Sequence, residues 1–125
     1  MSAVYPKFET GPVTFAAEAE VTGGQVVVAG IEPRTVKPAD ADATNIVGVA
    51  IQDAKPEGPT KHTAVACSPA QIAVKVVGSV AVGDLVKTAA DGAVTKADPA
   101  ADAGKILGRV IETLAEEHAS IRLYV

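Results

Sequence analysis

The residues that could bind a metal ion are few and widely spaced. His62, His118 and Cys67 are the only histidines and cysteine of the chain, and no His-x-x-x-His or Cys-x-x-Cys spacing joins them. A zinc site needs three or four converging nitrogen or sulfur ligands. The run from Asp40 to Asn45 alternates oxygen-bearing side chains as a calcium loop does, but the glycine and distal glutamate of an EF-hand are missing. We predict a solvated loop here, and no metal and no cofactor in the protein.

Nucleophilic catalysis is not favoured either. None of the serines lies in a Gly-x-Ser-x-Gly motif, and the only base near Cys67 in sequence is His62. Cys67 is therefore expected to be a small buried thiol. The glycine turns at Gly23-Gly24 and Gly83 lead into valine-rich strand patterns, so they lack the helix N-terminus on which a phosphate-binding loop depends. We predict no catalytic residues and no enzymatic activity.

Charge and hydropathy bear on the partners of the protein. The net charge is −4 and the eight lysines are scattered singly, which argues against binding to a phosphate backbone. The first residues lack a basic region followed by an apolar run, and no stretch approaches 18 uninterrupted apolar residues. We expect a soluble cytoplasmic product with no nucleic-acid or membrane partner.

The apolar residues indicate an all-β protein, a small β-barrel or β-sandwich. Hydrophobic residues make up 48% of the chain and are mostly Val, Ala and Ile, and no window of 11 or more residues has a 3.6-residue apolar stripe. Alternation predicts that Ile121 and Leu123 face the core while Arg122 faces solvent or an interface, and that Val47, Val49 and Ile51 share one face. Strands are predicted at 13–16, 25–29, 46–52, 63–66, 71–77, 84–88, 93–96, 105–113 and 118–125.

Glycines at similar offsets suggest that the chain contains a repeat. Gly24 precedes Gly48 by 24 residues, Gly83 precedes Gly108 by 25, and each of these glycines adjoins or interrupts a valine- or isoleucine-rich run. This pattern predicts two related β units. Asp91-Gly92 predicts a hairpin between Val86 and Val94. Because no linker divides the chain, we predict one β domain over residues 12–125.

Residues 1–11 form a separate segment that is predicted to be an extended N-terminal arm. Pro6, Gly11 and Pro12 discourage regular structure, and Val4, Tyr5 and Phe8 place apolar and aromatic side chains there. Burial of such side chains against another surface lowers the free energy of binding. We predict that Val4, Tyr5 and Phe8 contact a capsid or a neighbouring subunit; the alternative is that the arm folds back over one end of the barrel.

The order of these motifs resembles the capsid cement, or head decoration, proteins of tailed bacteriophages. The resemblance spans roughly residues 11–125 and rests on the early glycine-turn-valine strand, the mid-chain Gly48-Val49-Ala50 strand, the Gly83-Asp84-Leu85-Val86 hairpin, the Ile106-Leu107-Gly108 strand and the terminal Ile121-Arg122-Leu123 strand. It implies a non-enzymatic protein that binds the major capsid protein on the capsid exterior, as homotrimers at threefold or quasi-threefold positions, after synthesis in the host cytoplasm. Arg109 and the proline-rich loop at 55–61 depart from the family pattern.

Two other functions stay open at this point. Biotinyl and lipoyl carrier domains also use Val-Gly-Asp-x-Val hairpins, but they present a modified lysine at a hairpin tip, a setting that Lys55 and Lys87 both lack. Another phage virion β module, such as a tail component, would differ mainly in its place on the particle.

Overall fold

The fold is all-β, as predicted, in the computed structural model, which describes residues 11–125. A 3₁₀ turn, η1, covers Ala90–Gly92. The strands are β1 (Val13–Ala17), β2 (Val26–Ala29), β3 (Thr35–Pro38), β4 (Ile46–Ala50), β5 (His62–Ala66), β6 (Gln71–Lys75), β7 (Leu85–Thr88), β8 (Val94–Lys96), β9 (Gly108–Leu114) and β10 (His118–Leu123).

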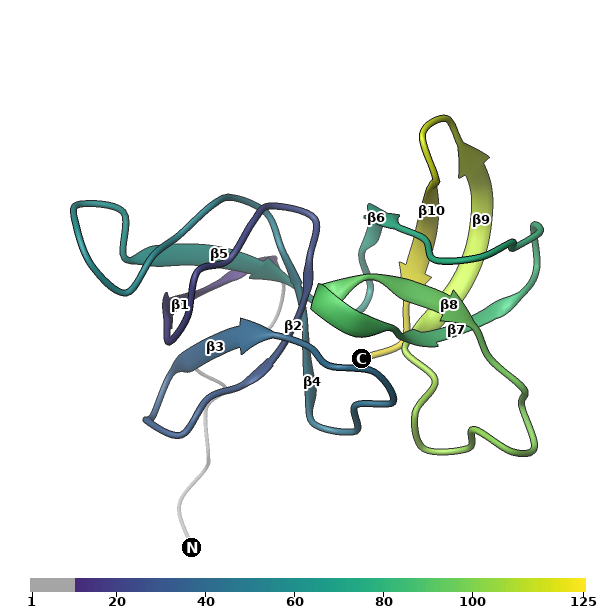
Figure 1. The fold of residues 1–125 in the computed structure, drawn as a ribbon, viewed down its shortest axis with the longest axis horizontal. Helices are drawn as coiled ribbons and strands as arrows, with labels where there is room; N and C mark the ends of the chain where they lie inside the picture. Colours follow the sequence, from purple (N-terminus) through teal and green to yellow (C-terminus); the bar gives the residue numbers. More distant parts are fainter. Residues whose placement is uncertain (1–10) are drawn as a thin grey trace, which may run out of the picture.

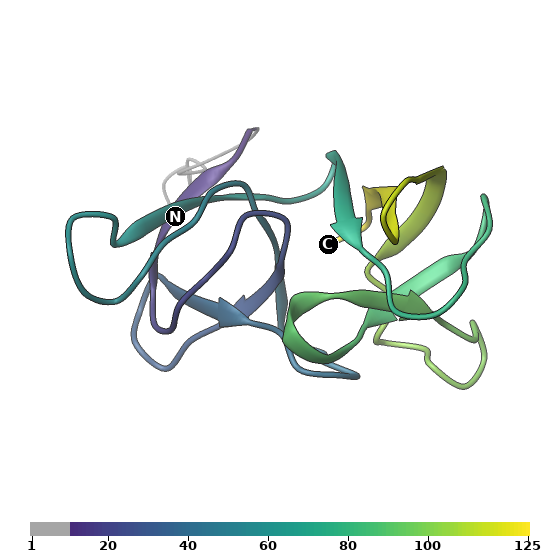
Figure 2. The ribbon, with the colours of Figure 1, turned by 45° about the horizontal axis from the view of Figure 1, so that its top comes forward.

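The strands form two units that lie side by side along the longest axis of the molecule (Figure 1). In the first unit, β1 to β5 close into a barrel in the order β1-β3-β2-β4-β5. In the second, β6 to β10 form a five-stranded sheet in the order β6-β10-β9-β7-β8, whose end strands are joined by a parallel bridge between Val76 and Val94. The connection from β5 to β6 passes between the units (Figure 2).

The two units have the same topology, which confirms the predicted repeat. Read around the barrel, β1-β5-β4-β2-β3 corresponds strand by strand to β6-β10-β9-β7-β8. The registers correspond as well: Val27 pairs with Gly48 in the first unit, and Val86 pairs with Gly108 in the second. The parallel contact of Ala17 with Val36 likewise matches the bridge of Val76 with Val94.

The hydrogen bonds around the two glycine turns repeat in the same way. Gly24 N donates to Ala50 O at 2.8 Å, and Gly83 N donates to Val110 O at 2.8 Å. Gly48 and Gly108 occupy equivalent places, where a Cβ would collide with the carbonyl oxygens of Ala66 and Arg122, respectively. The glycine offsets in the sequence therefore mark positions where each unit needs a close backbone approach.

Two apolar clusters form the core. The smaller fills the first barrel and includes Val27, Val36 and Val65. The larger contains the interior of the second unit, such as Leu107 and Ile121, and extends to side chains of the first unit. Its first-unit members include Val26, Val28 and Val49. Strands β2 and β4 are therefore buried on both faces, between the first barrel and the second unit.

The predicted faces are confirmed in β10 and wrong in β4. Ile121 and Leu123 are buried and Arg122 is exposed. In β4, however, Ala50 is fully buried while Ile51, just past the strand, is 47% exposed. The register between β2 and β4 shifts at Val47, which interrupts the simple alternation along this strand. Burial on both faces then removes the contrast between a polar and an apolar side.

The predicted hairpin is present, and one strand was missed. Strands β7 and β8 pair through Thr88 and Val94 around Asp91 and Gly92, whose positive φ angles of 56° and 71° suit an Asp-Gly turn. The sequence does not predict strand β3, because the strand is four residues long and ends in Pro38. Proline argues against a strand, since it cannot donate a backbone hydrogen bond to the ladder. Pro38 is tolerated because it forms the last pair of the β2–β3 ladder, with Val27.

Candidate interaction surface

A groove of about 440 Å³ lies at the junction of the two units. One wall is the turn Thr22–Gln25, which leads into β2. The other wall contains Lys75 and Val77 at the end of β6, together with residues 90–93 and His118. His118 Nδ1 lies 2.7 Å from Glu116 O, so the carbonyl orients the imidazole ring. The groove therefore lies between a turn of the first unit and a different part of the second unit.

Close contacts hold the turn against the second unit. Gln25 Nε2 donates to Asp91 O at 3.0 Å, and Gly92 N donates to Ala39 O at 2.9 Å. A Cβ on Gly92 would lie 2.7 Å from Gln25 Cβ and 2.9 Å from Val26 O. Only glycine lets the 90–92 loop approach the first unit this closely. The hairpin that the Asp-Gly signal predicted thus also serves the junction.

An ion-pair network joins the units on another side. Lys87 Nζ lies 2.8 Å from Asp42 Oδ1 and 3.1 Å from Asp102 Oδ1. The hydrogen bond and the charge of Lys87 hold the pKa of Asp42 below its usual value. The pKa of Asp102 is also lowered, mainly by the hydrogen bond from the backbone N–H of Asp98 and, in second place, by the hydrogen bond from Lys87. Hydrogen bonds to Asp42 and Asp102 in turn raise the pKa of Lys87.

The segment considered as a calcium loop takes part in this network. Asp42 has a left-handed backbone with φ of 57° and binds Lys87, and the carbonyl of Asp40 accepts a 2.8 Å hydrogen bond from the Thr88 hydroxyl. The same hydroxyl oxygen accepts a 2.8 Å bond from Ala43 N. The 40–45 segment is thus fastened to β7 through its own polar groups.

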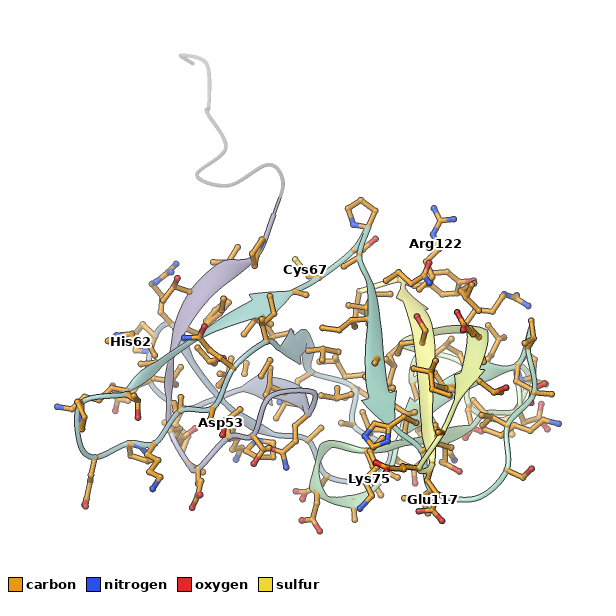
Figure 3. The ribbon with its side chains drawn as sticks, turned by 90° about the horizontal axis from the view of Figure 1, so that it is seen from above. Asp53, His62, Cys67, Lys75, Glu117 and Arg122 are labelled. Carbon is orange, nitrogen blue, oxygen red and sulfur yellow. The ribbon has the colours of Figure 1, made fainter. Side chains whose placement is uncertain are left out.

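The residues considered for metal binding or nucleophilic chemistry are not brought together. His62 lies on the outer side of the first unit, Cys67 lies near the connection between units, and His118 lines the junction groove (Figure 3). Within residues 11–125, no group of three or more His, Cys, Asp or Glu side chains is arranged to hold a metal ion. Cys67 is half-buried rather than fully buried as expected, because it follows the last residue of β5.

The structure shows exposed apolar residues that sequence reasoning did not single out. Ile31, in the loop between β2 and β3, is 85% exposed, and Val82, in the turn before β7, is 66% exposed. Both lie beside glycine, Val82 in a predicted glycine turn and Ile31 between two predicted strands. Nearby, Arg109 donates hydrogen bonds to the Tyr124 hydroxyl at 2.9 Å and to Gly83 O at 2.7 Å, so the residue that departs from the family pattern braces the Val82 turn.

The predicted contact residues Val4, Tyr5 and Phe8 lie outside the described part of the chain. The arm joins β1, whose Val13 pairs with Val65 of β5. Of the two lysines weighed for a carrier function, Lys87 lies within β7 in the ion-pair network rather than at a hairpin tip. Lys55 lies in the exposed 55–61 loop, where its backbone N–H bonds to Thr60 O at 2.9 Å. Residues 11–125 contain no helix long and apolar enough to cross a membrane.

Comparisons with known proteins identify a similar fold. Neither a scan against protein-family models nor a search of curated proteins finds a match. Among solved structures, the chain is similar to the N base of the head fiber protein gp8.5 of bacteriophage phi29, with a TM-score of 0.68 and 18% sequence identity. The similarity covers 90% of this chain and 92% of that chain. The chain thus shares its fold, over nearly its whole length, with part of a phage head fiber, in line with the resemblance to phage head proteins.

Proposed function

We propose that this protein is a non-enzymatic structural component of a phage virion that binds the outer surface of the capsid and stabilises it. The observation that carries the proposal is the similarity of fold to a phage head fiber base, which extends over 90% of the chain. The sequence supports it independently, through the order of its glycine and valine strand motifs. The partner in this proposal is the major capsid protein.

We further propose that the protein acts as a homotrimer at threefold or quasi-threefold positions of the capsid. A trimer presents three copies of each contact surface, so individually weak contacts combine into stable attachment. Such a protein needs a rigid scaffold, and two units joined through a continuous core and an ion-pair network supply one. Val4, Tyr5 and Phe8 of the arm are the proposed contacts with the capsid or with a neighbouring subunit.

Binding to phage heads that lack the protein tests this function. Purified protein mixed with such heads should cosediment with them to a saturating number of copies, and decorated heads should release DNA at a higher temperature than bare heads. Cryo-electron microscopy of the decorated heads should show density on the exterior at threefold positions. Failure to cosediment would contradict the proposed function, and density on a tail would indicate a different virion protein.

A variant without residues 2–10 is the matched control for the arm. It should keep the circular dichroism spectrum and melting temperature of the full chain, because the described strands all lie after residue 12. It should, however, bind heads weakly or not at all. If it decorates heads with undiminished occupancy, the arm is not the anchor, and the exposed loop at 53–61 becomes the next segment to test.

A further inference from the structure

Besides the shared core and the ion-pair network, the contact between the two units includes a turn and a face that have counterparts in each unit. The turn Thr22–Gln25 of the first unit contacts the 90–93 loop of the second through Gln25, and it faces Lys75, Val77 and His118 across the junction groove. Because the units share one topology, the second unit has its own copy of the turn, and the first has its own copy of the face. Within residues 11–125, neither of these copies takes part in the contact between the units.

The unused turn is Ala81–Asp84, here called the tip turn. It has the internal bonds of its counterpart: Ala81 N donates to Asp84 Oδ2 at 2.8 Å, as Thr22 N donates to Gln25 Oε1 at 2.8 Å. Unlike its counterpart, it is not covered within residues 11–125. Val82 is 66% exposed, and nothing lies within 4 Å of the position where a Cβ on Gly83 would be.

The unused face is formed by Ala16, Glu18, the 31–34 loop and His62, here called the end face. The strand registers establish the equivalence, because Ala16 pairs with His62 in the first unit as Lys75 pairs with His118 in the second. The backbone contacts agree: Gly30 N donates to Thr35 O at 2.9 Å, and Ala89 N donates to Ala93 O at 2.8 Å. Residues 31–34 and His62 are all exposed.

Both unused surfaces carry an exposed apolar side chain. Ile31 on the end face and Val82 on the tip turn are the two most exposed of the large hydrophobic residues described. A single exposed apolar residue is ordinary on a protein surface. Here the two lie on the counterparts of the turn and the face that meet at the junction. The β2–β3 loop and the β6–β7 turn also lie toward opposite ends of the longest axis (Figures 1 and 2).

We infer that copies of this chain associate head to tail, with the tip turn of one copy docked on the end face of the next. The partner is thus a second copy of the same chain, and the contact uses the counterparts of the turn and the face at the junction, with Asp84 in place of Gln25 and the 31–34 loop, which has no glycine, in place of residues 90–93. Docking removes Val82 and Ile31 from water together, which favours association. Because two different surfaces meet, the interface is heterologous, so it forms a closed ring or an open filament according to the rotation between copies.

The inference deepens the proposed homotrimer and rests on it only for the number of copies. Three copies in a closed ring would satisfy every tip turn and every end face. An open filament would preserve the head-to-tail contact and contradict the trimer. An experiment can therefore contradict the trimer without contradicting the head-to-tail contact.

Charge substitutions at the two apolar positions test the contact. Sedimentation velocity of the full chain should show self-association, which Val82→Glu or Ile31→Glu should each weaken by about tenfold or more, because a charge would replace the apolar contact and lose its hydration on docking. Leu114→Glu is the matched control: Leu114 is also exposed, at 39%, but belongs to neither surface. All three variants should melt within a few degrees of the parent chain.

A mixture of the two variants is the sharpest test. Each retains one intact surface, so a head-to-tail contact predicts that V82E and I31E, each unable to extend alone, form heterodimers and nothing larger. The inference is overturned if the parent chain stays monomeric at millimolar concentration, if either variant associates as the parent does, or if the mixture forms no dimers. A monomeric chain that still decorates heads would overturn this inference and leave the proposed function intact.

Discussion

Neighbouring residues of β10 show how the environment sets the effect of a substitution. Ile121 is completely buried in the larger apolar cluster, whereas Arg122 is exposed on the opposite face of the strand. Removing atoms from a packed core loses their transfer free energy and leaves a cavity. Removing an exposed side chain does neither. Sequence alternation predicted both positions correctly because β10 has one buried and one exposed face.

Ile121→Ala should lower the free energy of unfolding by about 2–5 kcal/mol. Arg122→Ala should change it by no more than about 0.5 kcal/mol. Denaturant titration followed by circular dichroism measures both. An Ile121→Ala variant as stable as the parent chain would mean that the core can close around the missing atoms.

Gly92→Ala should be more damaging than a typical glycine substitution. It places a side chain at φ of 71° and within 3 Å of Gln25 Cβ and Val26 O, so left-handed strain of about 1–2 kcal/mol adds to overpacking of about 1–3 kcal/mol. Gly104→Ala is the control, because Gly104 has φ of 86° with nothing within 4 Å. Equal loss of stability in the two variants would show that the junction yields to accommodate the methyl group.

Lys87 acts at the scale of elements, because it fastens the loop after β3 and the loop after β8 to β7. The lowered pKa values of Asp42 and Asp102 mean that their stabilisation is present above the ordinary carboxyl pKa and is lost as pH falls through the folded-state values. The raised pKa of Lys87 means that its contribution is present below its ordinary pKa and is lost as pH rises through the folded-state value.

Lys87→Met should therefore lower the melting temperature at neutral pH and flatten its dependence on pH below about pH 4 and above about pH 10. Lys96→Met is the comparison, because Lys96 is 64% exposed and lies 3.9 Å from Asp84. Melting curves from pH 2 to 11 would show the difference. If both variants follow the pH profile of the parent chain, the network contributes nothing to stability.

At this same scale, the sequence predicted some strands better than others. Strands with one wet face, such as β6 and β10, alternate clearly, and the Asp-Gly turn marks the β7–β8 hairpin. Strand β4 was misread because it is buried on both faces and Val47 shifts its register. The sequence did not point to Ile31 and Val82 for a different reason. Their positions stand out only after the topology shows that the tip turn and the end face are the counterparts of the turn and the face at the junction.

For the whole molecule, the continuous core leads us to expect that residues 12–125 unfold in a single transition. Val26, Val28 and Val49 of the first unit are packed in the same cluster as Leu107 and Ile121 of the second, so neither unit can open without exposing apolar surface of the other. Calorimetric and van't Hoff enthalpies should agree. Two separate transitions would show that the units are independent domains.

The short connection between β5 and β6 has a consequence for how the junction could arise. Residues 67–70 hold the turn of one unit beside the face of the other, so the two meet at an effective concentration in the millimolar range or above. A contact too weak to join two separate molecules can then be fully formed within one chain. A tandem duplication of a single unit would therefore convert a transient encounter between identical molecules into a permanent internal interface. One copy of the turn and one copy of the face would be left at the two ends of the molecule.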